Sequence, residues 1–100
     1  MSKFVSIVTV TYVNSAEVIA SQSLAETMME KIAIDNGCER VRCYQSGDYI
    51  RIIIFEYNEE TIQTKVINSL KDYTDIHNKA FTFKMTTVRG NLLSDSHCLF

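Results

Sequence analysis

The sequence predicts an α+β domain in which one antiparallel sheet of four strands has both helices on a single face. Residues 4–13, 39–45, 48–57 and 80–89 are rich in β-branched and aromatic side chains, as strands are. After the first and third of these segments, apolar residues instead recur every three to four positions, which is typical of helices. Right-handed crossovers fold this order, β-α-β-β-α-β, into one sheet with one covered and one open face.

Length and composition describe one globular domain. The chain has 100 residues, of which 46% are hydrophobic and 22% charged, and we assign residues 1–90 to the domain and 91–100 to a C-terminal tail. Its formal charge of −2 gives no long-range attraction to a phosphate backbone, so nucleic acid is not an expected partner. The longest apolar run, Ile52 to Phe55, is far shorter than the roughly 20 residues of a membrane span, so no membrane is expected either.

The first strand and the first helix follow directly from their residue types. Residues 4–13 alternate β-branched residues with serine and threonine, which favours a strand over a signal peptide. Asn14 is expected to cap the helix, with Glu17 completing a capping box. The helix should be about 20 residues long and end near Gly37. Its buried stripe is predicted to contain Val18, Ala25, Met28, Met29 and Ile32.

Ser46 and Gly47 separate the second and third strands by the spacing of a two-residue hairpin turn. Such a turn pairs Gln45 with Asp48 and, four pairs into the sheet counting from the turn, Arg42 with Arg51. The face beneath the helices is then predicted to contain Val41, Cys43, Ile50, Ile52 and Ile54. The open face is predicted to contain Arg40, Arg42, Tyr44, Tyr49, Arg51, Ile53, Phe55 and Tyr57.

The second helix is expected to begin after an Asn58 cap and to end before the polar residues 75–79. Its buried stripe is predicted to contain Ile62, Val66, Leu70 and Tyr73. Residues 80–89 form the last strand, which Gly90 ends. The tail that follows is too apolar to extend into water, so we expect it to dock on a sheet edge or on a partner subunit. Its apolar residues are Leu92, Leu93, Leu99 and Phe100.

The open face is too apolar to be left in water, which indicates a homodimer formed through it. Arg42 opposite Arg51 places like charges across a strand pair, an arrangement that is unfavourable without compensation. One explanation is that carboxylates across the subunit interface neutralise the pair. The other is an anionic or planar aromatic ligand held by Arg42 and Arg51 and stacked beside Tyr44, Tyr49 or Tyr57. These five residues are the predicted ligand-binding set.

Over residues 3–90 the chain resembles a ferredoxin-like fold, by the order and length of its elements. With its amphipathic open face, it resembles the dimeric α+β barrel superfamily, in which two such subunits press their open sheet faces together. That superfamily includes antibiotic-biosynthesis monooxygenases, haem-degrading monooxygenases and stress-responsive barrel proteins, and the resemblance implies a pocket between sheet and helices. The tryptophan of the haem-degrading branch has no counterpart, because this chain has no tryptophan. These activities are therefore not carried over from the resemblance.

Other families with this element order lack their motifs here. Residues 13–15 offer neither the glycine-rich anion cradle of an acylphosphatase nor the cysteine pair of a metallochaperone. The third strand has the aromatic residues of an RNA-recognition module but not its glycines. An amino-acid-sensing module would have a glycine at the first strand-helix turn.

The titratable residues form no catalytic signature. Cys38, Cys43 and Cys98 are odd in number and lack zinc or redox spacing, so we expect reduced thiols in a cytoplasmic protein with no metal and no cofactor. His77 is expected just after the second helix, as a solvated partner of the helix dipole. It is the weak candidate for a catalytic base.

Two functions remain open. The first is a small homodimeric barrel that binds, and in some cases oxidises or otherwise transforms, an acidic or aromatic small molecule without a metal. The second is a non-catalytic dimerising or regulatory module. A closed pocket lined by polar side chains beneath the sheet favours the first, and a pocket filled by core side chains favours the second.

Overall fold

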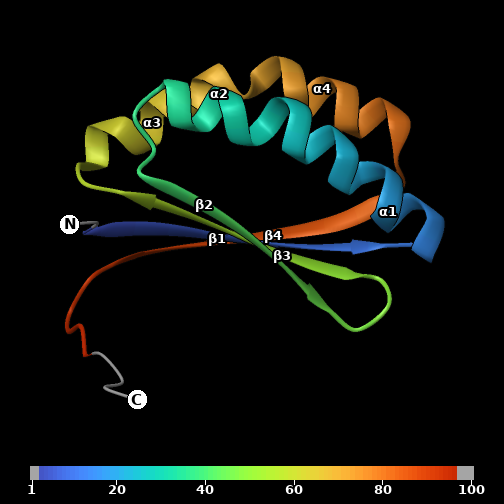
Figure 1. Ribbon diagram of the computed structural model, residues 1–100, viewed down its shortest axis with the longest axis horizontal. Helices are drawn as coiled ribbons and strands as arrows, with labels where there is room; N and C mark the ends of the chain where they lie inside the picture. The colour runs from blue at the N-terminus through green and yellow to red at the C-terminus, as the bar shows by residue number, and fades with distance from the viewer. Residues whose placement is uncertain (1–2, 97–100) are drawn as a thin grey trace.

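The computed structural model describes residues 3–96 and confirms the α+β architecture. In this described part of the chain, two helical segments lie across one face of a twisted antiparallel sheet and the other face carries no helix (Figure 1). The sheet order is β2-β3-β1-β4, so β1 and β3 are central and β2 and β4 are edge strands. The elements are β1 (Phe4–Tyr12), α1 (Ser15–Leu24), η1 (Ala25–Met29), α2 (Glu30–Asp35), β2 (Arg40–Ser46), β3 (Ile50–Tyr57), α3 (Glu60–Ser69), α4 (Lys71–Ala80) and β4 (Phe83–Asn91).

The first helical segment begins as predicted. The side chain of Asn14 accepts a hydrogen bond from the backbone N–H of Glu17 at 2.9 Å. In the middle of the segment, the N–H of Glu30 bonds to the carbonyl of Ala25, five residues back, which makes η1 a π-helical turn. The wider turn keeps side chains spaced by four on one face, and this is why the buried positions here are Ser21, Ala25, Met29 and Ala33.

The second helical segment is longer than predicted, and its start is different. Glu59, not Asn58, is the residue that precedes the first turn of α3. The helix bends at Leu70 and continues as α4, so residues 75–79 are helical and not a loop. Tyr73 and His77 are therefore one turn apart, and both are buried.

The predicted hairpin register is wrong. Gly47, Asp48 and Tyr49 form the turn, with Gly47 at a φ of +76°, and Ser46 pairs with Ile50. Arg42 therefore pairs with Ile54, and Gln45 with Arg51. The observed pairing differs from the predicted one by an odd number of residues. The side chains of β2 therefore lie on the faces predicted for them, and every side chain of β3 lies on the opposite face from the one predicted.

The observed orientation of β3 changes which side chains lie on each face of the sheet. Beneath the helices, β3 presents Arg51, Ile53, Phe55 and Tyr57, all of them buried. Its three isoleucines, predicted to be buried there, lie on the open face instead. The six aliphatic residues of that face, called here the open-face patch, are Val5, Ile7, Ile50, Ile52, Ile54 and Val88. All six are at least partly exposed in the single chain, and Val88 is 63% exposed.

The C-terminal end leaves the sheet later than predicted. Gly90 lies inside β4, opposite Val5, and does not end the strand. Leu92 donates a backbone hydrogen bond to the carbonyl of Lys3 at 2.7 Å. The docking expected of Leu99 and Phe100 concerns residues outside those described. Within residues 3–96, no helix is long and apolar enough to cross a membrane.

Candidate functional site

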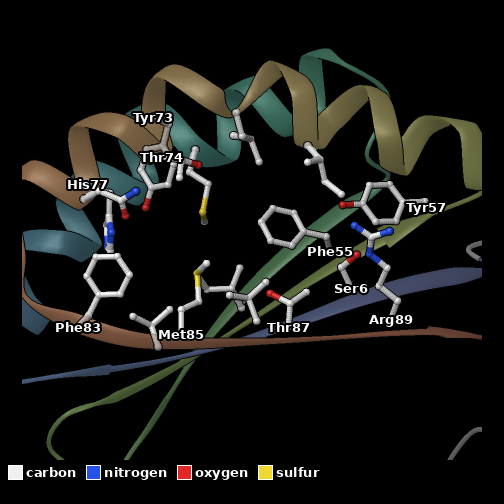
Figure 2. A pocket seen from close by; sticks show the side chains of 17 residues that line it. Ser6, Phe55, Tyr57, Tyr73, Thr74, His77, Phe83, Met85, Thr87 and Arg89 are labelled. Atoms are coloured by element: carbon white, nitrogen blue, oxygen red, sulfur yellow. The ribbon is translucent and has the colours of Figure 1, made fainter.

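A cavity of about 470 Å³ lies between the sheet and the second helical segment (Figure 2). Its floor comes from β1, β3 and β4, and its roof from α3, α4 and Met29 of η1. The side chains of β4 that face the helices remain accessible, Met85 being 53% exposed, so the cavity opens along the β4 edge of the sheet. The middle of the cavity is mostly apolar, with Thr87 as its polar residue, and further polar groups lie at its two ends. The apolar lining comprises Val8, Val10, Met29, Ile53, Phe55, Ile67, Leu70, Phe83 and Met85.

One polar end is built around His77 of α4. The Nε2 atom of His77 lies 2.7 Å from the hydroxyl of Tyr12 on β1. Phe83 packs edge-on against the imidazole with ring centres 4.4 Å apart, and Tyr73 and Phe81 lie within 6 Å of it. His77 as a whole is only 6% exposed, so contacts on several sides fix the orientation of its ring. An immobile imidazole at the wall of a cavity is suited to exchange a proton with a bound molecule.

The environment of His77 favours its neutral form. Burial lowers the pKa of His77, and the nearby Arg51 cation lowers it further against the opposing effect of Glu17. Burial likewise raises the pKa of Tyr12. Near neutral pH the pair is thus an uncharged imidazole bonded to a protonated phenol. When Nε2–H donates to the Tyr12 oxygen, Nδ1 is the nitrogen that can accept a proton.

Arg51 packs over the ring of Tyr12. Its guanidinium donates to the Ser21 hydroxyl at 2.7 Å and to the Val18 carbonyl, and its central carbon lies 5.7 Å from the centre of the Tyr12 ring. Arg51 is only 4% exposed, and its partners in these contacts are a hydroxyl and a carbonyl, not a carboxylate. Arg51 therefore positions Tyr12 and places a positive charge near the His77 end of the cavity.

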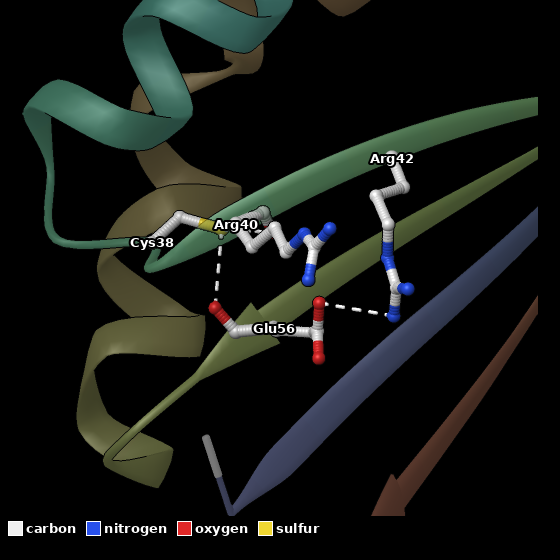
Figure 3. A network of polar contacts seen from close by, with 4 residues as sticks. All are labelled: Cys38, Arg40, Arg42 and Glu56. Atoms are coloured by element: carbon white, nitrogen blue, oxygen red, sulfur yellow. Dashed lines mark hydrogen bonds and ion pairs between the residues drawn. The ribbon is translucent and has the colours of Figure 1, made fainter. Parts of the chain in front are cut away.

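The predicted ligand-binding set does not come together as one site, although Tyr44 and Arg51 both line a second hollow beside α1 and β2. Arg42 lies on the open face, 3.1 Å from the carboxylate of Glu56, beside the contact between the Cys38 thiol and the Glu56 carbonyl (Figure 3). Tyr44 is exposed on that same face, and Tyr49 is exposed in the hairpin turn. Arg51 is buried beneath the helices, so the like-charge pair does not exist. Of the five, Tyr57 alone lines the cavity.

The cavity contains residues that sequence reasoning did not select. The second polar end contains Ser6, Tyr57 and Arg89 (Figure 2). Ser6 and Arg89 face each other across β1 and β4, but without the strand pairing neither could be distinguished from other polar residues of a strand. For His77 a signal was present, because the spacing Val66, Leu70, Tyr73, His77 continues the apolar stripe of the helix.

Within residues 3–96, no three His, Cys, Asp or Glu side chains come close enough to hold a metal ion. Cys38 and Cys43 are both free thiols, and burial raises the pKa of each. Both therefore stay protonated and poorly reactive near neutral pH. Cys98, and His97 beside it, lie outside the described residues.

The fold of this chain is similar to the folds of several solved structures. A dimeric ferredoxin-like protein from an uncultured marine organism superposes with a TM-score of 0.80 at 14% identity, over 98% of this chain and 94% of that one. A protein of unknown function from Nitrosomonas europaea gives 0.77 at 11% identity, over 100% and 98% of the two chains. A monooxygenase from Streptomyces coelicolor, in complex with the ligand nanaomycin D, gives 0.76 at 12% identity, over 97% and 93%.

No protein-family model matches the sequence, and no curated protein matches it. The structural likeness extends over nearly the whole chain at low identity, so it establishes the fold and not the activity. The chain has the ferredoxin-like fold, which it shares with two dimeric ferredoxin-like proteins and with the Streptomyces coelicolor monooxygenase.

Proposed function

We propose that this protein is a homodimer that binds an aromatic small molecule in the cavity between its sheet and its helices. The cavity itself carries this proposal. Its volume of about 470 Å³ falls in the usual range for ligand pockets, and its lining combines many apolar side chains with a few polar groups. A non-catalytic dimerising module would be expected to fill this space with core side chains, so the open cavity favours ligand binding.

The shape and chemistry of the lining support an aromatic ligand. Phe55 and Tyr57 stack with their ring planes 12° apart, and they form one wall with Phe83 at the other end of the space. Flat rings gain dispersion and stacking energy against such walls. The Streptomyces coelicolor monooxygenase, of similar fold, was solved with the ligand nanaomycin D, which is in keeping with a ligand-binding role for the fold.

The His77 end suggests what could happen to the ligand. A neutral imidazole whose Nε2–H donates to the Tyr12 oxygen has Nδ1 free to remove a proton from a phenolic hydroxyl placed against it. Deprotonation makes an aromatic ring more electron-rich and easier to oxidise. A transformation that begins with proton removal is therefore the chemistry that this end of the cavity supports.

The open-face patch supports the homodimer. It combines six aliphatic side chains on three adjacent strands, and an unprotected face of this kind favours association. Two of the similar structures are described as dimeric. The patch lies on the opposite side of the sheet from the cavity, so a dimer formed through it buries side chains that do not line the cavity.

Titration with phenylnaphthylamine, an uncharged probe that fluoresces in apolar sites, tests ligand binding. We expect saturable binding with one site per subunit. Thr74 of α4 is exposed at the cavity wall, so Thr74→Trp should fill the space and abolish binding. Asp72→Trp, on the exposed side of the same helix, is the control and should bind normally. Equal binding by both variants, or no binding by the unmutated protein, would contradict the proposal.

A further inference from the structure

The cavity has a second polar end with a composition different from the first. Arg89 of β4 and Ser6 of β1 are directly paired across the sheet, and both side chains point to the helix side. Figure 2 shows the Arg89 guanidinium beside the Tyr57 ring and the Ser6 hydroxyl. His77 stands at the far side of the apolar middle. A molecule that spans the cavity therefore meets Arg89 at one end and His77 at the other.

Arg89 sets the charge of this cavity. Among the described residues that line it there is no aspartate and no glutamate, and the one side chain with a fixed charge is Arg89. The His77 imidazole opposite is held in its neutral form by burial, which lowers its pKa. A cavity with a cation and no acid in its lining favours an anion over a neutral or cationic group of the same shape.

The neighbours of Arg89 present hydrogen-bond donors in the same place. Gln63 of α3 donates to the Ser6 hydroxyl, which leaves the Ser6 proton for the Tyr57 oxygen. Burial raises the pKa of Tyr57 to about 12, so its hydroxyl keeps its proton near neutral pH. Because Gln63 donates to Ser6 and Ser6 donates to the Tyr57 oxygen, the Tyr57 O–H remains free to donate to a ligand. An oxyanion held by a guanidinium and a phenol receives the short, strong bonds that anions form with such donors.

We infer that the molecule bound in the cavity is an aromatic acid whose carboxylate, or comparable oxyanion, is bound by Arg89 and Tyr57 while its rings lie in the apolar middle. This rests on the proposed function and adds the class and the orientation of the ligand. The acid end lies under α3, and the opposite end of the ring system lies against His77. A proton acceptor and an anion-binding site are thus separated by the length of the ligand.

Two probes with the same ring system test the inference. Anilinonaphthalene sulfonate carries an oxyanion, and phenylnaphthylamine is its uncharged counterpart. We expect the unmutated protein to bind the sulfonate about 10-fold more tightly than the uncharged probe, the range of one charge-assisted contact at a partly exposed arginine. Arg89→Gln should remove this preference and leave the affinity for the uncharged probe unchanged. Arg89→Lys should keep part of it, because lysine retains the charge but not the planar pair of donors.

Lys84→Gln is the matched control, because it removes one positive charge from the opposite face of the same strand. It should leave both affinities unchanged. Equal binding of the two probes by the unmutated protein, or an equal loss of sulfonate affinity in Lys84→Gln and Arg89→Gln, would overturn the inference while the proposed function stands. Failure of both probes to bind would overturn the proposed function and the inference together.

Discussion

Replacing Arg51 by alanine tests the corrected position of β3. The guanidinium is buried, bonded to the Ser21 hydroxyl and the Val18 carbonyl, and lies over the Tyr12 ring. Two charge-assisted hydrogen bonds contribute roughly 3 to 6 kcal/mol, and desolvation of the charge offsets several kcal/mol of this. Loss of the buried aliphatic stem adds about 2 kcal/mol. We therefore expect Arg51→Ala to lower the free energy of unfolding by about 2 to 4 kcal/mol.

Two comparison variants separate the terms. Arg51→Met keeps the stem and removes the charge, and Ser21 can still donate to the Val18 carbonyl at 2.9 Å, so no acceptor is left unpaired. Its cost should be about 0 to 1.5 kcal/mol. Arg42→Ala removes a partly exposed ion pair with Glu56 and should cost less than about 1 kcal/mol.

Thermal unfolding at one fixed subunit concentration measures these differences, since dimerisation makes the melting temperature depend on concentration. For a domain of this size each kcal/mol shifts the midpoint by about 4 to 8 °C, so Arg51→Ala should melt at least about 8 °C lower. Equal costs for Arg51→Ala and Arg42→Ala would refute the reasoning. Such a result would mean that both arginines lie on the open face, as the two-residue turn predicts.

The other predictions concern association, protonation and the tail. Ile52→Lys places a charge within the open-face patch and should give the mass of one subunit in light scattering, whereas Thr61→Lys, on the exposed face of α3, should remain dimeric. The folded-state pKa of His77 lies below its ordinary 6.5, so the stability it contributes is complete above about pH 6.5 and is lost as the pH falls through the folded value. His77→Phe should therefore give a urea midpoint that depends less on pH between about pH 7.5 and pH 5, and an unchanged slope would exclude this role. Ending the chain at Gly90 should lower the melting temperature and the dimer affinity if the tail docks, and no change in either would contradict docking.

The order of the elements could be predicted from the sequence because each element has a clear local signal. Asn14 caps the first helix, strand residues are concentrated in β1, and polar residues mark most of the boundaries. These signals depend on neighbouring residues only. Local patterns therefore sufficed for the fold class.

The face of β3 could not be predicted, because Ile50–Tyr57 is apolar on both faces. Alternation distinguishes the two faces only where one is polar, so the prediction depended on the turn alone. Gly47 is compatible with a two-residue turn and with the longer turn that the structure contains. Because the turn was predicted one residue too short, Arg51, Phe55 and Tyr57 were predicted on the open face, whereas the structure has them buried.

The cavity could be predicted only in part. The length of the second helical segment was underestimated because residues 75–79 are polar, although Tyr73 and His77 lie on its buried face. The resemblance to α+β barrels implied a pocket between sheet and helices. The residues that line it depend on how α3 and α4 cross the sheet, a tertiary property with no local signal.

Methyl NMR of the unmutated protein, titrated with anilinonaphthalene sulfonate, tests most directly whether the space between sheet and helices is the ligand site. Val8 and Ile53 line the cavity, and Val5 and Ile52 lie on the same two strands but on the open face. We predict that the methyl signals of Val8 and Ile53 shift and show contacts to the probe, while those of Val5 and Ile52 do not. Shifts concentrated at Val5 and Ile52 would contradict the account, because they would place the ligand on the opposite face of the sheet.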